Sequence, residues 1–178
     1  PTVPDATTPG DALAEIRRYR IDLPAKILDH IASDNAKAPT PDDPAFCRNS
    51  HHVIASAAVS LEAAAKAAEE AGIRAVILSD AIEGEAREAG RFHAALAREI
   101  LARNRPFTRP VVLLSGGETT VTLRGSGKGG RNSEFLLSFA LSISGLEGIE
   151  ALAADTDGID GSEDNAGAFA NGTTAARL

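Results

Sequence analysis

The chain has 178 residues, of which 43% are apolar, 24% charged and 4% aromatic, and its formal net charge is −7. These proportions are typical of a packed globular domain and exclude a disordered chain. An acidic chain lacks the basic face that phosphate backbones require, so no nucleic acid is expected as a partner. Because the sequence has no run of about 18 apolar residues, no membrane partner is expected, and the cytoplasm is the expected location.

The first part of the chain predicts two short helices, at residues 11–19 and 25–31. A segment rich in proline and aspartate follows and predicts a linker, with a domain boundary near Asp42 to Phe46. After it, strands alternate with helices. Strands are expected at 51–56, 74–80 and 148–158, and helices at 60–72, 84–104 and 133–144.

Residues 110–125 are expected to form a β-hairpin, with Ser115-Gly116-Gly117-Glu118 as its turn. Alternating polar and apolar residues after the turn indicate a strand with one open face. His93 falls in the long helix and is expected at the surface. The predicted fold is α/β: a layered sheet with flanking helices, mixed parallel and antiparallel, including this hairpin.

The stretch "RGSGKGGRNSEF" at residues 124–135 raises the question of phosphate binding. It is not a Walker A loop, because Thr122 stands in place of the first glycine and Gly129 in place of the last Ser or Thr. It does match the G-x-G-x-x-G dinucleotide pattern at Gly125, Gly127 and Gly130. The alternating strand before it counts against that interpretation, because the first strand of a dinucleotide fold is apolar throughout.

Another interpretation is an anion site at a helix N-terminus. Asn132 or Ser133 would cap the helix, and backbone N–H groups of the paired glycines would face the ligand. Lys128 and Arg131 would add positive charge, and an arginine can hold phosphate through two parallel hydrogen bonds. The plain alternative is a flexible connection.

A cluster of acids follows the last expected strand, at Asp155, Asp157 and Asp160. In open α/β sheets, ligands bind beyond the carboxyl ends of strands. Oxygen ligands suit Mg²⁺, which typically takes one or two carboxylates together with substrate phosphates. The alternative is an acidic turn, since Asp and Gly are common turn residues.

Several segments together resemble the glycerate 2-kinase family, namely "PTVPDATT", "HHVIAS", "EGEAREAGRFHAALA", "LLSGGETTVTLRGSGKGGRNSEFLLSFAL" and "ALAADTDGIDGSEDNAGAF". The C-terminal region of that family is called the MOFRL domain, and members of the family are often labelled hydroxypyruvate reductase. Family members are longer than this chain. The resemblance therefore implies a fragment that is inactive alone. Residues 1–45 would be the tail of an incomplete N-terminal Rossmann-like domain, and residues 46–178 a MOFRL-like α/β domain truncated at its C-terminus.

The reaction implied by the resemblance is ATP-dependent phosphorylation of D-glycerate to 2-phosphoglycerate with Mg²⁺. Arg131 and Lys128 would act on the transferring phosphate, and Asp155 and Asp157 would hold Mg²⁺. The groups expected to bind the nucleotide are Gly116, Gly117, Glu118, Thr119, Gly129, Gly130, Asn132 and, from the first domain, Asp5.

The expected partners are glycerate, the nucleotide and the missing N-terminal domain, and a homo-oligomer is an open alternative. Two other functions remain open. One is an NAD(P)H-dependent hydroxypyruvate reductase, favoured by the G-x-G-x-x-G match. The other is a non-catalytic phosphate- or nucleotide-binding module.

Overall fold

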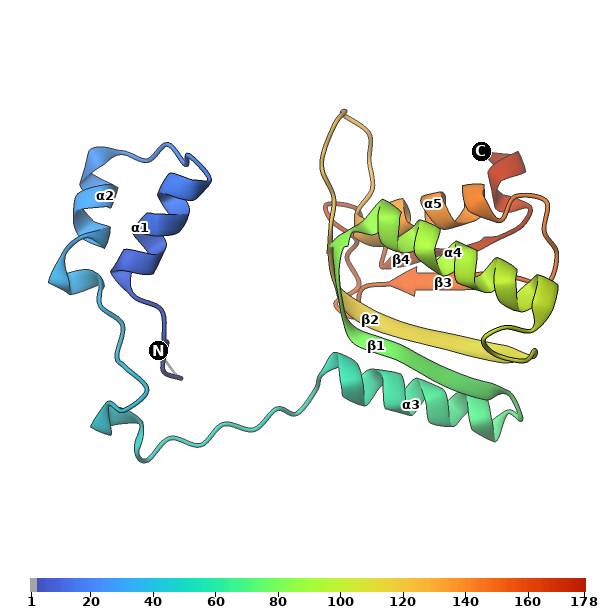
Figure 1. The fold of residues 1–178 in the computed structure, drawn as a ribbon, viewed down its shortest axis with the longest axis horizontal. Helices are drawn as coiled ribbons and strands as arrows, with labels where there is room; N and C mark the ends of the chain where they lie inside the picture. The colour runs from blue at the N-terminus through green and yellow to red at the C-terminus, as the bar shows by residue number, and fades with distance from the viewer. Residues whose placement is uncertain (1–2) are drawn as a thin grey trace. The chain divides into compact units, whose positions relative to one another are not determined.

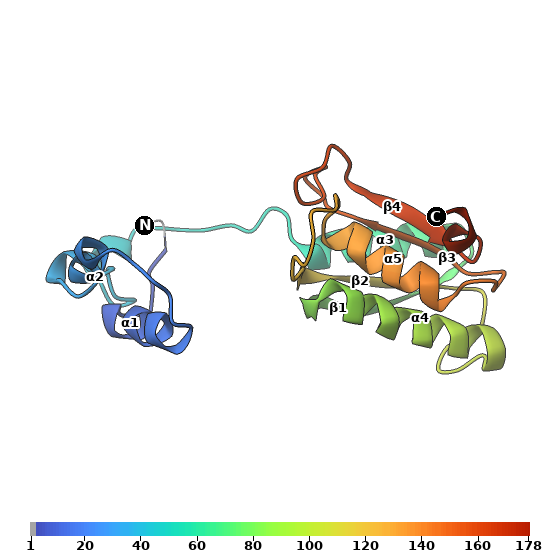
Figure 2. The same cartoon turned by 90° about the horizontal axis from the view of Figure 1, so that it is seen from above.

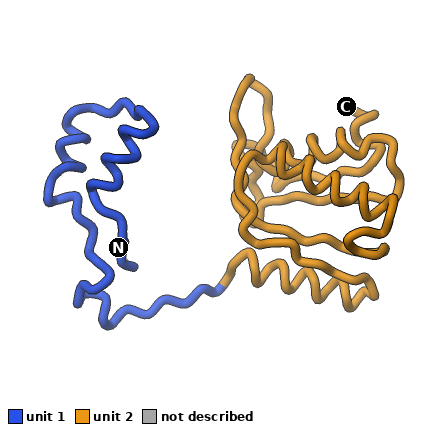
Figure 3. The backbone as a smooth tube through the Cα atoms, viewed as in Figure 1, with its two compact units in different colours: residues 1–54 blue, residues 55–178 orange. Residues whose placement is uncertain are grey.

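The computed structural model describes residues 3–178, which divide into two compact units with the boundary after residue 54 (Figure 3). The first unit contains the helices α1 (Pro9–Arg18) and α2 (Ala25–Ile31) and two short 3₁₀ turns, Asp34–Ala36 and Pro44–Phe46. Helix α1 begins with a capping box, in which Thr8 and Asp11 each accept a hydrogen bond from the other's backbone N–H. Both expected helices of this segment are confirmed, and none of residues 3–54 is buried.

The second unit, residues 55–178, is built in layers (Figure 1). Helix α3 covers one side of a pair of strands, β1 and β2, and helix α4 lies on the other side. Helix α5 packs between α4 and a second pair of strands, β3 and β4, as the view from above shows (Figure 2). The elements are α3 (Ala57–Glu70), β1 (Arg74–Glu85), α4 (Ala86–Arg103), β2 (Val111–Thr120), α5 (Arg131–Ser142), β3 (Glu150–Ala154), β4 (Gly167–Asn171) and a 3₁₀ turn, Thr174–Arg177.

The predicted α/β class is confirmed, because β1 and β2 are parallel and α4 connects them. The apolar run of β1, residues 75–78, predicts a strand covered on both faces. Helices α3 and α4 both contact β1, but the cover is partial, since Ile77 is 40% exposed. Helix α3 ends as the sequence predicted, with Gly72 at a φ of 78° and its N–H bonded to the Glu69 carbonyl. No helix in residues 3–178 is both long and apolar enough to cross a membrane.

The hairpin predicted at residues 110–125 is wrong, because Gly116 and Gly117 lie inside β2 and form no turn. Gly117 pairs with Ile82 across the parallel ladder, beside an irregularity in β1. A Cβ atom on Gly117 would lie 2.1 Å from the Ile82 carbonyl oxygen. The glycine therefore permits a close approach of two strands. In the sequence alone, a glycine with this role cannot be distinguished from a glycine in a turn.

The antiparallel pair lies elsewhere in the chain, between β3 and β4, where Leu152 pairs with Phe169. Strand β4 was not predicted. The strand expected at 51–56 is also wrong, because these residues form no regular element, and Val53 and Ile54 are 76% and 93% exposed. Strands need a partner for their backbone groups, and no other described strand pairs with this segment.

The core of this unit lies where α4, α5 and the second strand pair meet. One cluster contains Ala94, Phe139, Ile143 and Ile149, and a second contains Leu136, Ala140 and Ala170. Helices α4 and α5 approach closely at Gly90, where a Cβ atom would lie 2.3 Å from a backbone oxygen of α5.

His93 faces this core, so its predicted surface position is wrong. One ring nitrogen lies 2.8 Å from the Ala89 carbonyl oxygen and the other 3.0 Å from the Ser115 hydroxyl. His93 lies three residues after Gly90, on the side of α4 that packs against α5 and β2. The polar ring is tolerated in the interior because both of its nitrogens have partners.

Candidate active site

The N-terminus of α5 is capped by Asp160, a residue from the loop after β3. Its carboxylate accepts the backbone N–H groups of Asn132 at 2.9 Å and Ser133 at 2.8 Å, and also the Ser133 hydroxyl. Gly130 occupies the N-cap position and supplies no side-chain cap. The expectation that Asn132 or Ser133 would cap this helix is therefore wrong, because both lie within its first turn and donate to a distant carboxylate.

Asp160 is fully buried, which by itself would raise the pKa of its carboxyl group. The hydrogen bonds from Ser133 and Asn132 outweigh this effect and hold the pKa of Asp160 below its usual range. The group is therefore an anion at neutral pH. It takes the place at the helix N-terminus that a phosphate would otherwise occupy.

Arg131, the first residue of α5, lies between two carboxylates. Its Nη2 donates to Asp155 Oδ1 at 2.8 Å, its Nε reaches the same oxygen at 3.2 Å, and its Nη1 donates to Glu118. Asn132 Nδ2 donates to the other Asp155 oxygen at 2.7 Å. The hydrogen bond to Asp155 is the main cause that raises the pKa of Arg131 above its ordinary value. The end of β2, the start of α5 and the end of β3 thus meet at one guanidinium.

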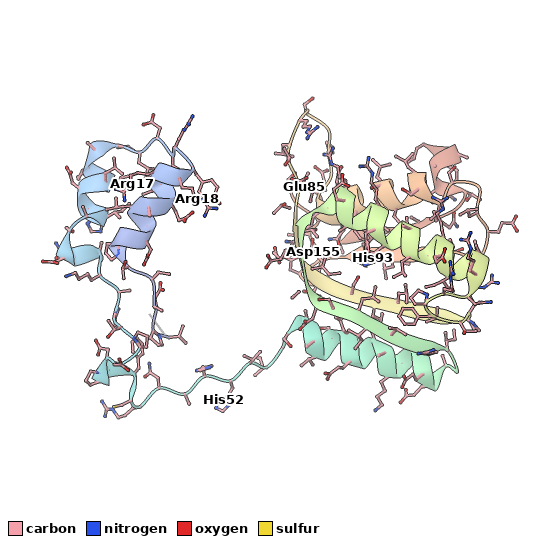
Figure 4. The ribbon with its side chains drawn as sticks, viewed as in Figure 1. Arg17, Arg18, His52, Glu85, His93 and Asp155 are labelled. Carbon is pink, nitrogen blue, oxygen red and sulfur yellow. The ribbon has the colours of Figure 1, made fainter. Side chains whose placement is uncertain are left out.

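A pocket of about 550 Å³ opens beside this guanidinium. It lies at the carboxyl ends of β2 and β3, the end of the unit at which Asp155 and Glu85 are labelled in Figure 4. Its wall contains these residues from the predicted set: Thr119, Gly129, Gly130, Arg131, Asp155 and Asp157. The structure therefore brings the cationic glycine loop and the acidic strand end to one site, as expected from the position of ligand sites in α/β sheets.

Other residues of the predicted set lie elsewhere. Gly116 packs near Ala57 and Leu61, and Gly117 lies against β1, so neither lines the pocket. Lys128 is exposed, lies 3.9 Å from Glu163 and lines a different pocket.

Asp5 belongs to the first unit, where its carboxylate accepts hydrogen bonds from the backbone and side chain of Thr7, at 2.8 Å and 2.7 Å. These bonds lower the pKa of Asp5.

The acids around the pocket can supply only part of a metal site. Within residues 3–178, no group of three or more His, Cys, Asp or Glu side chains is arranged to hold a metal ion. Both oxygens of Asp155 already accept hydrogen bonds from Arg131 or Asn132, whereas Asp157 is exposed and accepts one, from the Ile159 N–H at 3.0 Å. This donor set fits Mg²⁺ only if phosphate oxygens and water complete the shell, which is the usual mode for that ion.

Sequence reasoning placed Asp160 in the acidic cluster but missed its role as a cap. The helix was expected to begin at residue 133, where Asn132 could serve as a cap. Only the observed start at Arg131 puts Gly130, which has no side-chain acceptor, at the N-cap, so that the first N–H groups need an acceptor from elsewhere. The acceptor itself lies 27 residues beyond Ser133, and nothing local identifies it.

Comparisons with known proteins show which family and which relatives the chain is similar to. Residues 111–178 match the MOFRL family. An Agrobacterium vitis protein, provisionally named a hydroxypyruvate reductase, is 47% identical over 171 residues, which cover 95% of this chain and 38% of that protein. The glycerate 2-kinase of Pyrococcus horikoshii is 42% identical over 188 residues, which cover 100% of this chain and 41% of that protein.

A solved structure is also similar, the crystal structure of glycerate kinase from Thermotoga maritima. Its TM-score is 0.79 at 35% identity, and the match covers 98% of this chain and 41% of that one. The chain thus spans about two fifths of the length of each of these relatives.

Proposed function

We propose that the chain is part of a protein of the glycerate 2-kinase family and that this protein transfers a phosphoryl group to glycerate. The MOFRL match at residues 111–178 and the similarity to named glycerate kinases support the proposal. We further propose that ATP is the donor, that Mg²⁺ assists, and that 2-phosphoglycerate is the product. The observation that supports this most is the guanidinium of Arg131, which Asp155 holds at the wall of the 550 Å³ pocket.

In this proposal Arg131 binds the transferring phosphoryl group. Phosphoryl transfer depends mainly on positioning and charge neutralisation, and a fixed guanidinium provides both. Asp155 accepts hydrogen bonds from Nε and Nη2 of Arg131, so Nη1 is the nitrogen that can donate to an incoming anion. Glu118, whose side chain is 76% exposed, accepts from Nη1 and would be displaced by the ligand.

The metal in this proposal lies next to Asp157, with Asp155 contributing directly or through water. When bound, Mg²⁺ would supply neutralisation of the phosphate charge. Thr119, Gly129 and Gly130, which also line this pocket, would lie beside the phosphate.

The proposal is tested by Arg131→Lys in the full-length protein, with ADP release measured in the presence of D-glycerate and Mg²⁺-ATP. Lysine keeps the charge but cannot form the two-sided contact with Asp155, so we expect kcat/KM to fall by about 10²-fold or more. The matched control is Arg91→Lys on the exposed side of α4, where the arginine pairs with Glu88 at 2.8 Å. Normal turnover of Arg131→Lys would contradict the assigned role.

The second candidate is a reductase of hydroxypyruvate that uses NAD(P)H, favoured by the name of the Agrobacterium vitis relative and by the Gly125, Gly127 and Gly130 pattern. The alternation before the glycines no longer counts against a dinucleotide site, because residues 121–124 lie outside β2, and β2 itself is parallel to β1. A stronger objection replaces it. In dinucleotide folds the pyrophosphate lies at the helix N-terminus, and here the carboxylate of Asp160 fills that position.

The same preparation distinguishes the alternatives. Oxidation of NADH with hydroxypyruvate, without ADP release from glycerate and ATP, would favour the reductase. Binding of Mg²⁺-ATP with neither reaction would favour a non-catalytic nucleotide-binding module.

A further inference from the structure

A second pocket, of about 330 Å³, lies against the loop of residues 121–130 that joins β2 to α5. Both pockets are lined by Val121, Leu123, Gly129 and Gly130, so this loop is the wall that they share. The second pocket lacks Arg131 and the acids of the first. Instead it contains three cations from two elements, namely Arg87 on α4 and Arg124 and Lys128 on the loop.

Acids near the pocket form ion pairs with two of these three cations. Arg87 pairs with Glu134 at 3.0 Å, and Lys128 lies 3.9 Å from Glu163. Within residues 3–178, by contrast, no carboxylate forms an ion pair with Arg124, although the pocket lies in a chain of net charge −7.

Glu85 is the other acid close to Arg87 and Arg124, and it is already engaged. It accepts the Thr122 hydroxyl and, at 3.3 Å, the Thr122 N–H, and these bonds are the main cause that lowers the pKa of Glu85. The charges of the two arginines act on it in the same direction. Glu85 therefore fixes the start of the loop at Thr122, two residues before Arg124, and so keeps Arg124 in the same pocket as Arg87.

Arg87 also has a donor without a partner. Its Nε atom is buried, yet no acceptor within the described residues bonds to it. Buried polar atoms nearly always have a partner, so an orphaned guanidinium nitrogen requires an explanation. The backbone of Arg87 is held firmly, since its carbonyl accepts the Ser138 hydroxyl at 2.7 Å.

We propose that this second pocket binds a phosphate-bearing anion, at a site separate from the Arg131 pocket. Guanidinium groups suit phosphate oxygens because they can donate two parallel hydrogen bonds. A Cβ atom added to Gly125 or Gly127 would meet no other atom within 4 Å, which leaves room for a ligand against the backbone. Val121, Leu123 and Leu137 add an apolar part to the wall. The site goes beyond the proposed kinase activity and does not depend on it.

Calorimetric titration of the chain with sodium tripolyphosphate, without metal, tests the site. ADP in a parallel titration distinguishes a nucleotide from a free polyphosphate, because only ADP can use the apolar wall. We expect Arg87→Gln and Arg124→Gln each to weaken tripolyphosphate binding by about tenfold, the effect of one lost charge-assisted contact. Arg91→Gln, one turn further along α4 and outside the pocket, should bind as the unchanged chain does.

Arg131→Gln separates the two pockets. If the second pocket is an independent site, this variant keeps the binding that Arg87→Gln and Arg124→Gln weaken. Loss of all binding in Arg131→Gln, or unchanged binding in Arg124→Gln, would overturn the proposal, as would the absence of any heat with the unchanged chain. Arg124 is on the loop and forms no ion pair within residues 3–178, so its variant remains informative even if Arg87→Gln fails to fold.

Discussion

Replacing the buried cap of α5 by its amide, Asp160→Asn, should destabilise the second unit strongly. The carboxylate accepts four hydrogen bonds, from the N–H groups of Asn132 and Ser133, the Ser133 hydroxyl and, at 3.3 Å, Asn132 Nδ2. An asparagine keeps one acceptor oxygen, and its NH₂ group would face a backbone N–H. The loss of the charge and the opposed donors predict a cost of about 2–4 kcal/mol.

Urea unfolding followed by far-ultraviolet circular dichroism is the suitable assay, because the chain has no tryptophan to report by fluorescence. A cost of this size should lower the urea midpoint by about 1–2 M. Asp157→Asn is the matched control in the same loop. Its carboxylate is exposed and accepts a single N–H, from Ile159, so its stability should change by no more than about 0.5 kcal/mol.

The pH dependence gives a second measurement of the same group. The folded-state pKa of Asp160 is depressed, so the carboxylate stabilises the fold above its unfolded pKa of about 4, and this stability is lost as the pH falls through the folded pKa. The unchanged chain should therefore lose this part of its stability in acid, and Asp160→Asn should not. Equal urea midpoints for the two proteins at neutral pH would refute the role of Asp160 as a cap.

Other substitutions test the fold in the same unfolding assay. Gly117→Ala should lower the free energy of unfolding by about 2–4 kcal/mol, because the new Cβ atom would meet the backbone of Ile82. Gly125→Ala, whose new Cβ atom meets nothing within 4 Å, should be close to neutral. Similar urea midpoints for the two variants would refute the close approach of the strands at Gly117. Ser115→Ala should cost about 1 kcal/mol, because it leaves a buried nitrogen of His93 without its partner; an unchanged midpoint would mean that this bond adds nothing.

Local patterns were sufficient to predict most helices of this chain. The helix expected at 84–104 is α4 with its ends moved by one or two residues, and Gly72 follows α3 as a helix-terminating glycine. The apolar run of β1 correctly indicated a strand, although its cover by α3 and α4 is only partial. Each of these features depends on residues within a few positions of one another, which is the range over which periodicity and capping are informative.

The errors concern partners that are distant in the sequence. The glycines of β2 looked like a turn because the close approach of Ile82 cannot be read from neighbouring residues. Strand β4 has five residues and becomes a strand through its pairing with β3. The meeting of the glycine loop with the acidic strand end agrees with the position of ligand sites at the carboxyl ends of strands, whereas the direct bond between Arg131 and Asp155 was not predicted. The functional roles of the two residues remain predictions.

The cap of α5 also has a consequence for the order of folding. The first turn of α5 reaches its final hydrogen bonding only after the chain has returned with Asp160, 27 residues beyond Ser133. Closing a loop of that length carries an entropic cost before any contact compensates it. The start of α5 should therefore form late, in the same step that docks β3, while the middle of the helix can associate earlier with α4 through Phe139 and Ala94.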